Sequence, residues 1–333
     1  MINQALLTPE VQQYITDNLS SDISALRMKK SPFTGVSSLE LVQQIQGKKI
    51  AQTKLPFLYK EKQILYPPHL NLEQASSQAT AQFKQKLISG KKGIDLTGGT
   101  GIDSYFISES AESFHYLEPN PDLLETVQHN FSALQRNNCT FLNTTAENFL
   151  ANNTQTFDFI YLDPSRRDEN KNKKFLLEDL VPNVIELQET LLKASSSVFI
   201  KLSPLLDLQQ AIHQLSIAEI YIISLKNEVK ELLIKLDPDQ EKNNHNPLIR
   251  CFNLESGQPE FSFRWKDEKE VEIPLYSSPL SFLFFPNASI LKSGAFKLIA
   301  QKFKIKKLHP NTHLYTSDQI IPDFPGRTFT VSD

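Results

Sequence analysis

The sequence predicts an α/β fold, in which a mostly parallel sheet ends in an antiparallel hairpin, after a helical region and before a smaller α+β portion. Short apolar runs alternate with helical patterns from 91 to 236, as in parallel sheets. Five of the ten glycines lie between residues 90 and 101, and none occurs from 102 to 256. The apolar runs 220–225 and 231–236 are too close together for a helical crossover, so we expect an antiparallel hairpin there.

Composition excludes several classes of protein. A chain of 333 residues with 40% hydrophobic residues is long enough for two or three domains with buried cores. Its 35 Lys+Arg against 38 Asp+Glu exclude a globally basic nucleic-acid coat protein but permit a local basic face. The two cysteines, Cys139 and Cys251, form no disulfide framework or zinc motif. No secretory signal or membrane-length apolar run is visible, so we expect a cytoplasmic protein with no membrane partner.

The first 85 residues read as helical. A helix is expected to begin at Pro9, and another after the capping box of residues 37–40. We expect Gly47 to end that second helix. A further helix is predicted over 72–89, directly before the glycine cluster.

The middle region, 86–237, carries the alternating pattern. Its expected strands are 93–97, 113–117, 157–162 and 197–202, and its clearest helices are 121–136 and 176–193. The polar, proline-bounded stretch 237–247 reads as a domain boundary.

Two smaller portions follow the boundary. Residues 248–275 are expected to form short strands, as a small β-rich, ferredoxin-like segment. Residues 276–333 read as an apolar run at 281–285, a helix over 288–303 and strands near 313 and 328. The chain ends inside an expected strand, so we expect this last portion to be incomplete.

The glycine cluster is the strongest candidate for a ligand site. The segment 94–103 (IDLTGGTGID) follows a strand and opens a helix, and glycines allow backbone to approach a nucleotide closely. The NAD fingerprint would need glycine at 104, where Ser104 stands, so a dinucleotide fits less well. The alternative is a tight strand-to-helix turn with no ligand.

Three acids follow at strand ends. Glu118 ends the second run 23 residues after Asp95, where an acid commonly holds a ribose diol, although an exposed strand-end acid is the alternative. Glu147 follows the run TFLN (140–143), the expected third strand, and is expected near an adenine, with a segment that contacts no ligand as the alternative. Asp163 and Pro164 end the fourth strand, which should face the first across the ligand crevice.

Together these motifs resemble a known family. Asp-x-x-Gly-Gly-x-Gly, Glu-Pro-Asn, Leu-Asp-Pro-x-Arg and the terminal hairpin are similar to class I S-adenosylmethionine (SAM)-dependent methyltransferases. The sequence most resembles bacterial members with a THUMP-like domain after the catalytic domain. The resemblance covers 74–236 and 281–327, including segments 292–297 and 309–315, and the run 41–56 is also similar.

The resemblance implies a Rossmann-like sheet over 86–237, a THUMP-like domain over 276–333, and SAM as cofactor. The implied cofactor-binding residues are Asp95, Thr97, Gly98, Gly99 and Gly101 for the amino acid part, Glu118, Pro119 and Asn120 for the ribose, Ala146 and Glu147 near the adenine, and Asp163. Asp163 and Pro164 would border the methyl-acceptor pocket.

The sequence departs from the family pattern at two places. Thr97 stands where glycine is frequent. Asp163-Pro164-Ser165-Arg166 replaces the Asn/Asp-Pro-Pro-aromatic motif of amine methyltransferases, so the aromatic platform for a flipped base is missing. This departure argues against direct amine methylation of an adenine.

The expected catalytic residues are Asp163, Pro164 and Arg166. An aspartate is a weak base, so Asp163 is expected to orient the acceptor by a hydrogen bond. Arg166 and Arg167 suit a nucleic-acid phosphate, or else an ion pair with Asp168 or Glu169. Lys201, at the end of the fifth expected strand, either contacts substrate or is solvated.

A local basic stretch points to the substrate. Lys304, Lys306 and Lys307 lie in a lysine-rich segment interleaved with phenylalanines, which suits an RNA-binding face, or else an amphipathic helix with solvated lysines. Segment 169–175 adds three lysines. No histidine cluster indicates a metal.

We therefore predict methyl transfer to a nucleotide of structured RNA, ribosomal or transfer. The alternatives are a methyltransferase for a small molecule or protein, and a non-catalytic RNA-binding protein that retains a SAM-shaped domain. An NAD-dependent dehydrogenase is a poorer fit, because of Ser104 and the hairpin.

Overall fold

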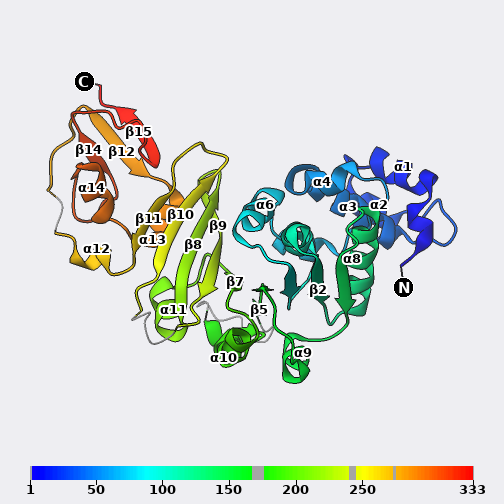
Figure 1. Ribbon diagram of the computed structural model, residues 1–333. Helices are drawn as coiled ribbons and strands as arrows, with labels where there is room; N and C mark the ends of the chain where they lie inside the picture. The colour runs from blue at the N-terminus through cyan, green and yellow to red at the C-terminus, as the bar shows by residue number, and fades with distance from the viewer. Residues whose placement is uncertain (1, 167–175, 240–244, 273–274, 333) are drawn as a thin grey trace. The chain divides into compact units, whose positions relative to one another are not determined.

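The computed structural model describes residues 2–166, 176–239, 245–272 and 275–332. The chain divides into two compact units, Met1–Leu162 and Asp163–Asp333. The fold is mixed α/β, with a mostly parallel sheet and a separate small antiparallel sheet near the C-terminus (Figure 1). The predicted α/β class is therefore confirmed. In the described ranges, no helix is long and apolar enough to cross a membrane.

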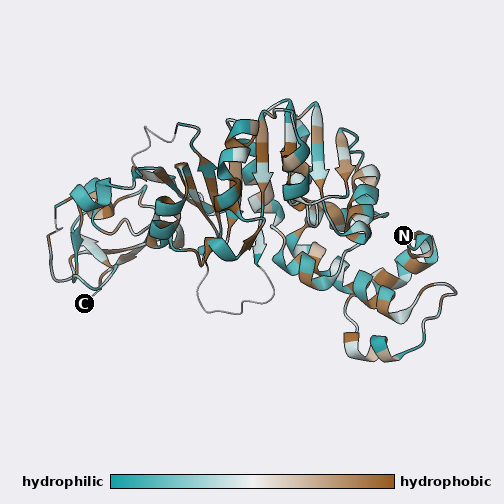
Figure 2. Ribbon diagram, turned by 90° about the horizontal axis from the view of Figure 1, so that it is seen from below, coloured by the Kyte–Doolittle hydropathy of each residue, from teal (hydrophilic) through white to brown (hydrophobic). Residues whose placement is uncertain are grey.

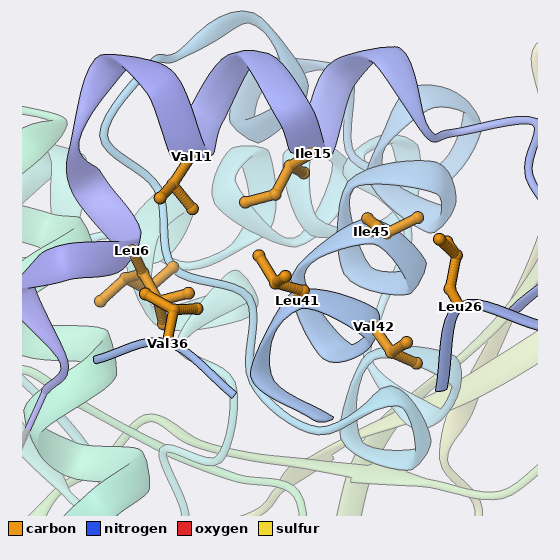
Figure 3. Packing of buried hydrophobic residues seen from close by; sticks show 9 residues of the cluster. Leu6, Val11, Ile15, Leu26, Val36, Leu41, Val42 and Ile45 are labelled. Atoms are coloured by element: carbon orange, nitrogen blue, oxygen red, sulfur yellow. The ribbon is translucent and has the colours of Figure 1, made fainter. Parts of the chain in front are cut away.

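The first unit begins with helices, as predicted (Figure 1). They are η1 (Gln4–Leu7), α1 (Pro9–Asp17), α2 (Ile23–Met28), α3 (Ser38–Lys54), α4 (Pro56–Lys60), α5 (His69–Gln74) and α6 (Gln78–Leu87). Side chains of α1, α2 and α3 meet in one apolar cluster, which includes Val11, Ile15 and Ile45 (Figure 3). Ile15 and Ile45 are almost fully buried, which indicates a core of this region's own.

Helix α3 has the predicted start but not the predicted end. Ser37 accepts the Glu40 backbone N–H at 3.2 Å and Glu40 accepts the Ser37 N–H at 2.7 Å, which completes the capping box. The prediction that Gly47 ends this helix is wrong, because α3 continues to Lys54. A Cβ on Gly47 would lie 2.1 Å from Cβ of Tyr66, so this glycine permits close packing.

The helix predicted over 72–89 is two helices, α5 and α6. Ser77 interrupts the pattern because its hydroxyl accepts the Thr80 backbone N–H at 3.2 Å and caps α6. Helix α6 packs against α7 (Ile102–Ile107), the helix that follows the glycine cluster.

The sheet of the first unit is parallel. Its strands, in the order β4-β1-β2-β3, are β4 (Phe159–Leu162), β1 (Lys92–Asp95), β2 (Ser113–Leu117) and β3 (Cys139–Leu142). The connecting helices are α7 (Ile102–Ile107), η2 (Ser108–Ser110), α8 (Pro121–Ala133) and α9 (Ala146–Asn152). Asp95 is in register with Tyr116 on one side and Tyr161 on the other. Figure 2 shows apolar residues within this sheet, and all four residues of β4 are buried, which is consistent with burial on both faces of that strand.

The second unit begins with β5 (Ser165–Arg166), η3 (Leu177–Asp179), β6 (Leu180–Val181), α10 (Val184–Ala194), β7 (Val198–Leu202) and α11 (Leu208–Gln214). The helix predicted over 176–193 is shorter, because Asn183 caps α10 just after Pro182. Strand β5 pairs with β6 in antiparallel fashion.

The predicted hairpin is confirmed. Strands β8 (Ile217–Leu225) and β9 (Glu228–Leu236) pair in antiparallel fashion. Lys226 and Asn227 join the two strands, with φ values of 53° and 64°. Positive φ at both positions is what a two-residue type I′ hairpin turn requires. The strands of 248–275 that the structure describes, β10 (Leu248–Leu254) and β11 (Phe261–Arg264), continue this sheet in the order β11-β10-β8-β9-β7.

The C-terminal sheet has the order β13-β14-β12-β15. Its strands are β12 (Phe282–Pro286), β13 (Lys306–Lys307), β14 (Tyr315–Ser317) and β15 (Gly326–Thr330), and the helices of this region are α12 (Asp267–Glu270), α13 (Ala288–Ser293) and α14 (Leu298–Phe303). The helix predicted over 288–303 is divided because Gly294, in the left-handed conformation at φ 77°, ends α13.

Candidate functional site

The glycine loop, residues 97–101, joins β1 to α7 and is fixed at both ends. Asp95 is 1% exposed and accepts the Thr97 backbone N–H at 2.9 Å. The hydroxyl of Ser104, in α7, donates to the other oxygen of Asp95. Asp95 thus closes the loop between strand and helix, the turn that the sequence predicted.

The three loop glycines have different physical roles. A Cβ on Gly98 would lie 2.2 Å from the Tyr116 ring, and one on Gly101 would lie 2.5 Å from Val127. These two glycines are explained by packing within the fold. Gly99 has φ 60°, and the nearest atom to an added Cβ is the Thr97 carbonyl oxygen at 3.7 Å. Of the three, only Gly99 has open space where a side chain would stand.

Glu118, directly after β2, reaches back to this loop. Glu118 is 8% exposed, and its carboxylate accepts the Gly99 N–H at 3.0 Å and the Asn120 N–H at 2.8 Å. Burial raises the pKa of Glu118, while the two N–H groups act to lower it. Tyr116 donates to the Gly99 carbonyl at 2.7 Å, and burial raises its pKa well above the ordinary value.

Pro119 and Asn120 follow Glu118 on the exposed surface, and Asn120 caps α8. Beyond β3, Ala146 is buried and Glu147 is exposed in the first turn of α9. A cavity of about 410 Å³ lies beside this region and is lined by Leu142, Asn143, Thr144, Phe149, Asn152, Asn153, Thr154 and Gln155. Asn143 links it to the acid, because its amide donates to the Glu118 carbonyl at 2.9 Å.

In the second unit, Asp163 forms an ion pair with Lys201 of β7. The Asp163 side chain is 38% exposed and that of Lys201 is 11% exposed, so the carboxylate can still be reached. Pro164 is buried, and Arg166 is exposed on β5. Arg167, Asp168 and segment 169–175 lie outside the described residues, so the predictions for them rest on sequence alone.

The three C-terminal lysines differ in exposure. Lys304 and Lys306 are exposed. Lys307 is 6% exposed, and its ammonium donates to the Pro310 carbonyl at 2.7 Å. Burial lowers the pKa of Lys307. Lys304 and Lys306 can therefore reach an external phosphate, whereas Lys307 contacts the fold.

Sequence reasoning missed a buried polar cluster beside the glycine loop. Lys84 of α6 is 0% exposed, and its ammonium lies 3.1 Å from a carboxylate oxygen of Asp103 in α7. Tyr161 of β4 donates to Asp103 at 2.7 Å, and Ser76 donates to the same carboxylate at 2.8 Å. Helical spacing could have indicated that Lys84 is buried, because it lies four and three positions after the buried residues Thr80 and Ala81, on the same face of α6.

The comparisons with known proteins agree with this architecture. A family model described as conserved hypothetical protein 95 matches residues 76–218, and one described as a ferredoxin-like domain matches 282–325. A crystal structure from Porphyromonas gingivalis W83, described as a "putative methyltransferase", is 28% identical, with a TM-score of 0.86. The alignment covers 100% of this chain and 83% of that protein. No curated protein matches the sequence.

Smaller structures align with part of the chain. An rRNA methylase from Streptococcus thermophilus is 13% identical, with a TM-score of 0.35, over 47% of this chain and 93% of that one. A Streptococcus mutans protein in complex with SAH is 12% identical, with a TM-score of 0.33. The alignment covers 47% of this chain and 96% of that protein. The full-length similarity to the P. gingivalis structure confirms the predicted Rossmann-like methyltransferase fold.

Proposed function

We propose that this protein is a SAM-dependent methyltransferase that modifies a nucleotide of structured RNA, ribosomal or transfer. The observation that carries the proposal is the hydrogen bond between the Gly99 backbone and the buried Glu118 carboxylate. The similarity to the P. gingivalis structure supports methyl transfer as the reaction class. The same proposal includes the resemblance to THUMP-like methyltransferases, the domain division expected from the sequence and a cytoplasmic location.

The residues present fit SAM. A carboxylate offers about four acceptor positions, and the two described N–H donors use one on each oxygen of Glu118. Two acceptor positions therefore remain for two ribose hydroxyls. The open space at Gly99 lets the loop backbone approach the amino acid part of the cofactor, with Asp95 and Thr97 holding the loop in shape. Ala146 and Glu147 would lie near the adenine.

When bound, SAM supplies a methyl group activated by its positively charged sulfur. The protein has to hold the acceptor in line with that methyl group and to exclude water. Asp163 would accept a hydrogen bond from the acceptor and orient its lone pair, while Lys201 holds the carboxylate in place. Pro164 would stiffen this turn, and Arg166 would bind a phosphate of the substrate.

RNA is favoured as substrate by cations that the fold leaves exposed. Arg166, Lys304 and Lys306 are all exposed and suit contacts to phosphates. Arg167 belongs to the same hypothesis by sequence. Methyl transfer to a small molecule or protein is the second candidate, and RNA binding without catalysis is the third.

Tritium transfer from labelled SAM tests the proposal. RNA from a strain that lacks this protein should become labelled when incubated with the wild-type chain. The same RNA should stay unlabelled when incubated with the Asp163→Ala variant. Label that appears instead on protein or on small molecules favours the second candidate. RNA binding without any transfer favours the third.

A further inference from the structure

The buried polar cluster of Ser76, Lys84, Asp103 and Tyr161 joins three elements around the glycine loop. Lys84 comes from α6, Asp103 from the first turn of α7, and Tyr161 from β4. The ammonium of Lys84 also donates to the Ser76 hydroxyl at 3.0 Å. All four side chains lie within the first unit, and the carboxylate of Asp103 binds partners from each of the other two elements.

Residues of the cluster lie beside both ends of the loop. Asp103 is the second residue of α7, and Gly101, the N-cap of that helix, ends the loop. Tyr161 is in register with Asp95, and its carbonyl accepts the Leu96 backbone N–H at 3.0 Å. A change in the position of Asp103 or Tyr161 would therefore move the backbone N–H groups of the loop.

Stability alone does not account for a buried ion pair in these surroundings. The apolar side chains of Leu72, Ala81, Ile102 and Phe106 belong to one core cluster around the same two helices. Removing two charges from water is costly, and replacing a buried pair by apolar residues of similar volume is often neutral or stabilising. Unlike apolar side chains, buried polar groups form directional hydrogen bonds. These bonds fix one arrangement of the helices and strands that they join.

We propose that Lys84 and Asp103, with Ser76 and Tyr161, are positioning residues that hold the glycine loop in the shape that binds the cofactor. They act through the loop, by fixing α7 against α6 and β4. This inference rests on the proposed function, since it concerns affinity for SAM and its product S-adenosylhomocysteine (SAH). It predicts that polar interactions in the cluster determine cofactor affinity more than they determine stability.

The test compares SAH binding by calorimetry with melting temperature in the full chain. The double variant Lys84→Met with Asp103→Asn keeps a similar volume and removes both charges, and the amide oxygen of the new side chain can still accept the hydroxyls of Ser76 and Tyr161. We expect its melting temperature to stay close to that of the wild type and its SAH affinity to fall about tenfold or more. Tyr161→Phe, which removes one hydroxyl, should weaken binding by about fivefold, the factor for one hydrogen bond.

The exposed ion pair Lys91–Glu112 of the same unit supplies the matched control. Lys91→Met with Glu112→Leu should leave SAH affinity unchanged. Amide hydrogen exchange of residues 97–101 without ligand should be faster in the double variant than in the wild type, and unchanged in the control. Wild-type affinity and exchange in both cluster variants would overturn the inference while the proposed function stands. A wild-type chain that does not bind SAH would overturn the proposed function itself.

Discussion

The backbone N–H of Gly99 donates to a carboxylate oxygen of Glu118 at 3.0 Å, across the two neighbouring strands β1 and β2. This bond joins the glycine loop to the acid that ends β2. Tyr116 adds a second link, because its hydroxyl donates to the Gly99 carbonyl at 2.7 Å. Loop and acid therefore form one prearranged surface, and changes to either are expected to affect ligand binding at both.

The loop glycines should respond differently to alanine. Gly99→Ala meets open space but requires a left-handed backbone, at a cost of about 1 kcal/mol of unfolding free energy. Gly98→Ala places its Cβ against the Tyr116 ring and should cost nearer the upper end of about 1–3 kcal/mol. Urea denaturation measures both values. Equal losses would show that the close approach to Tyr116 is not present in solution.

A matched control separates backbone strain from ligand binding. Gly35 also has positive φ and open space around it, in the helical N-terminal region. Gly35→Ala and Gly99→Ala should lose similar stability, but only Gly99→Ala should weaken SAH binding. Weakening of equal size in both variants would contradict the assigned role of Gly99.

The affinity for SAH should depend on pH through Glu118. Burial raises the pKa of this group, and the ionised form is the better acceptor of two ribose hydroxyls. Affinity should therefore fall as pH falls through the raised pKa of the folded state. Stability moves the opposite way, because a raised pKa in the folded state makes the contribution of Glu118 largest at low pH, and this contribution is lost as pH rises.

Calorimetry with SAH across the acidic range checks this dependence. Glu118→Gln should bind weakly and lose the part of the pH dependence that Glu118 causes. An identical profile in wild type and Glu118→Gln would assign the titration to another group.

Lys201→Met should slow methyl transfer by removing the ammonium that donates to Asp163. A small displacement of an orienting group can cost about a hundredfold in rate. The rate of tritium transfer at saturating SAM measures the effect. Lys235→Met on β9 removes a paired lysine whose side chain is 33% exposed, against 11% for Lys201, and should retain the wild-type rate. A wild-type rate in Lys201→Met would remove Lys201 from the site.

Lys304→Gln with Lys306→Gln should weaken RNA binding. Each lysine removed from a phosphate reduces the slope of log affinity against log salt by about 1, so the slope of the double variant should fall by about 2. A filter-binding titration at several salt concentrations gives this slope. Lys91→Gln with Lys193→Gln removes the same charge from exposed positions and should leave the slope near the wild-type value. Equal changes in both variants would indicate attraction by net charge alone.

Local patterns predicted the parallel strands and the hairpin well, because these elements follow apolar runs and short connections. The expected strand 113–117 is β2, and the spacing of Asp95 and Glu118 matches their places at the ends of two paired strands. The loop glycines were predictable as a group. Why Gly98 and Gly101 must each be glycine depends on packing against Tyr116 and Val127, which are distant in sequence.

The errors arise from tertiary packing and from single capping residues. Gly47 reads as a helix end, but its packing against Tyr66 keeps it inside α3. Asn183 starts α10 within a stretch whose periodicity is helical throughout. The Lys84–Asp103 pair was not predictable, since a lysine in a helix is normally solvated and its partner comes from another element.

The other proposals depend on the binding of SAM by the glycine loop and Glu118. Isothermal titration of the full chain with SAH, for wild type, Glu118→Ala and the control Glu112→Ala at the other end of β2, tests it most directly. We expect one site in the wild type and in Glu112→Ala, and no measurable binding in Glu118→Ala. A wild-type chain that does not bind SAH, or a Glu118→Ala chain that binds it as tightly as the wild type, would show that this is not the SAM site.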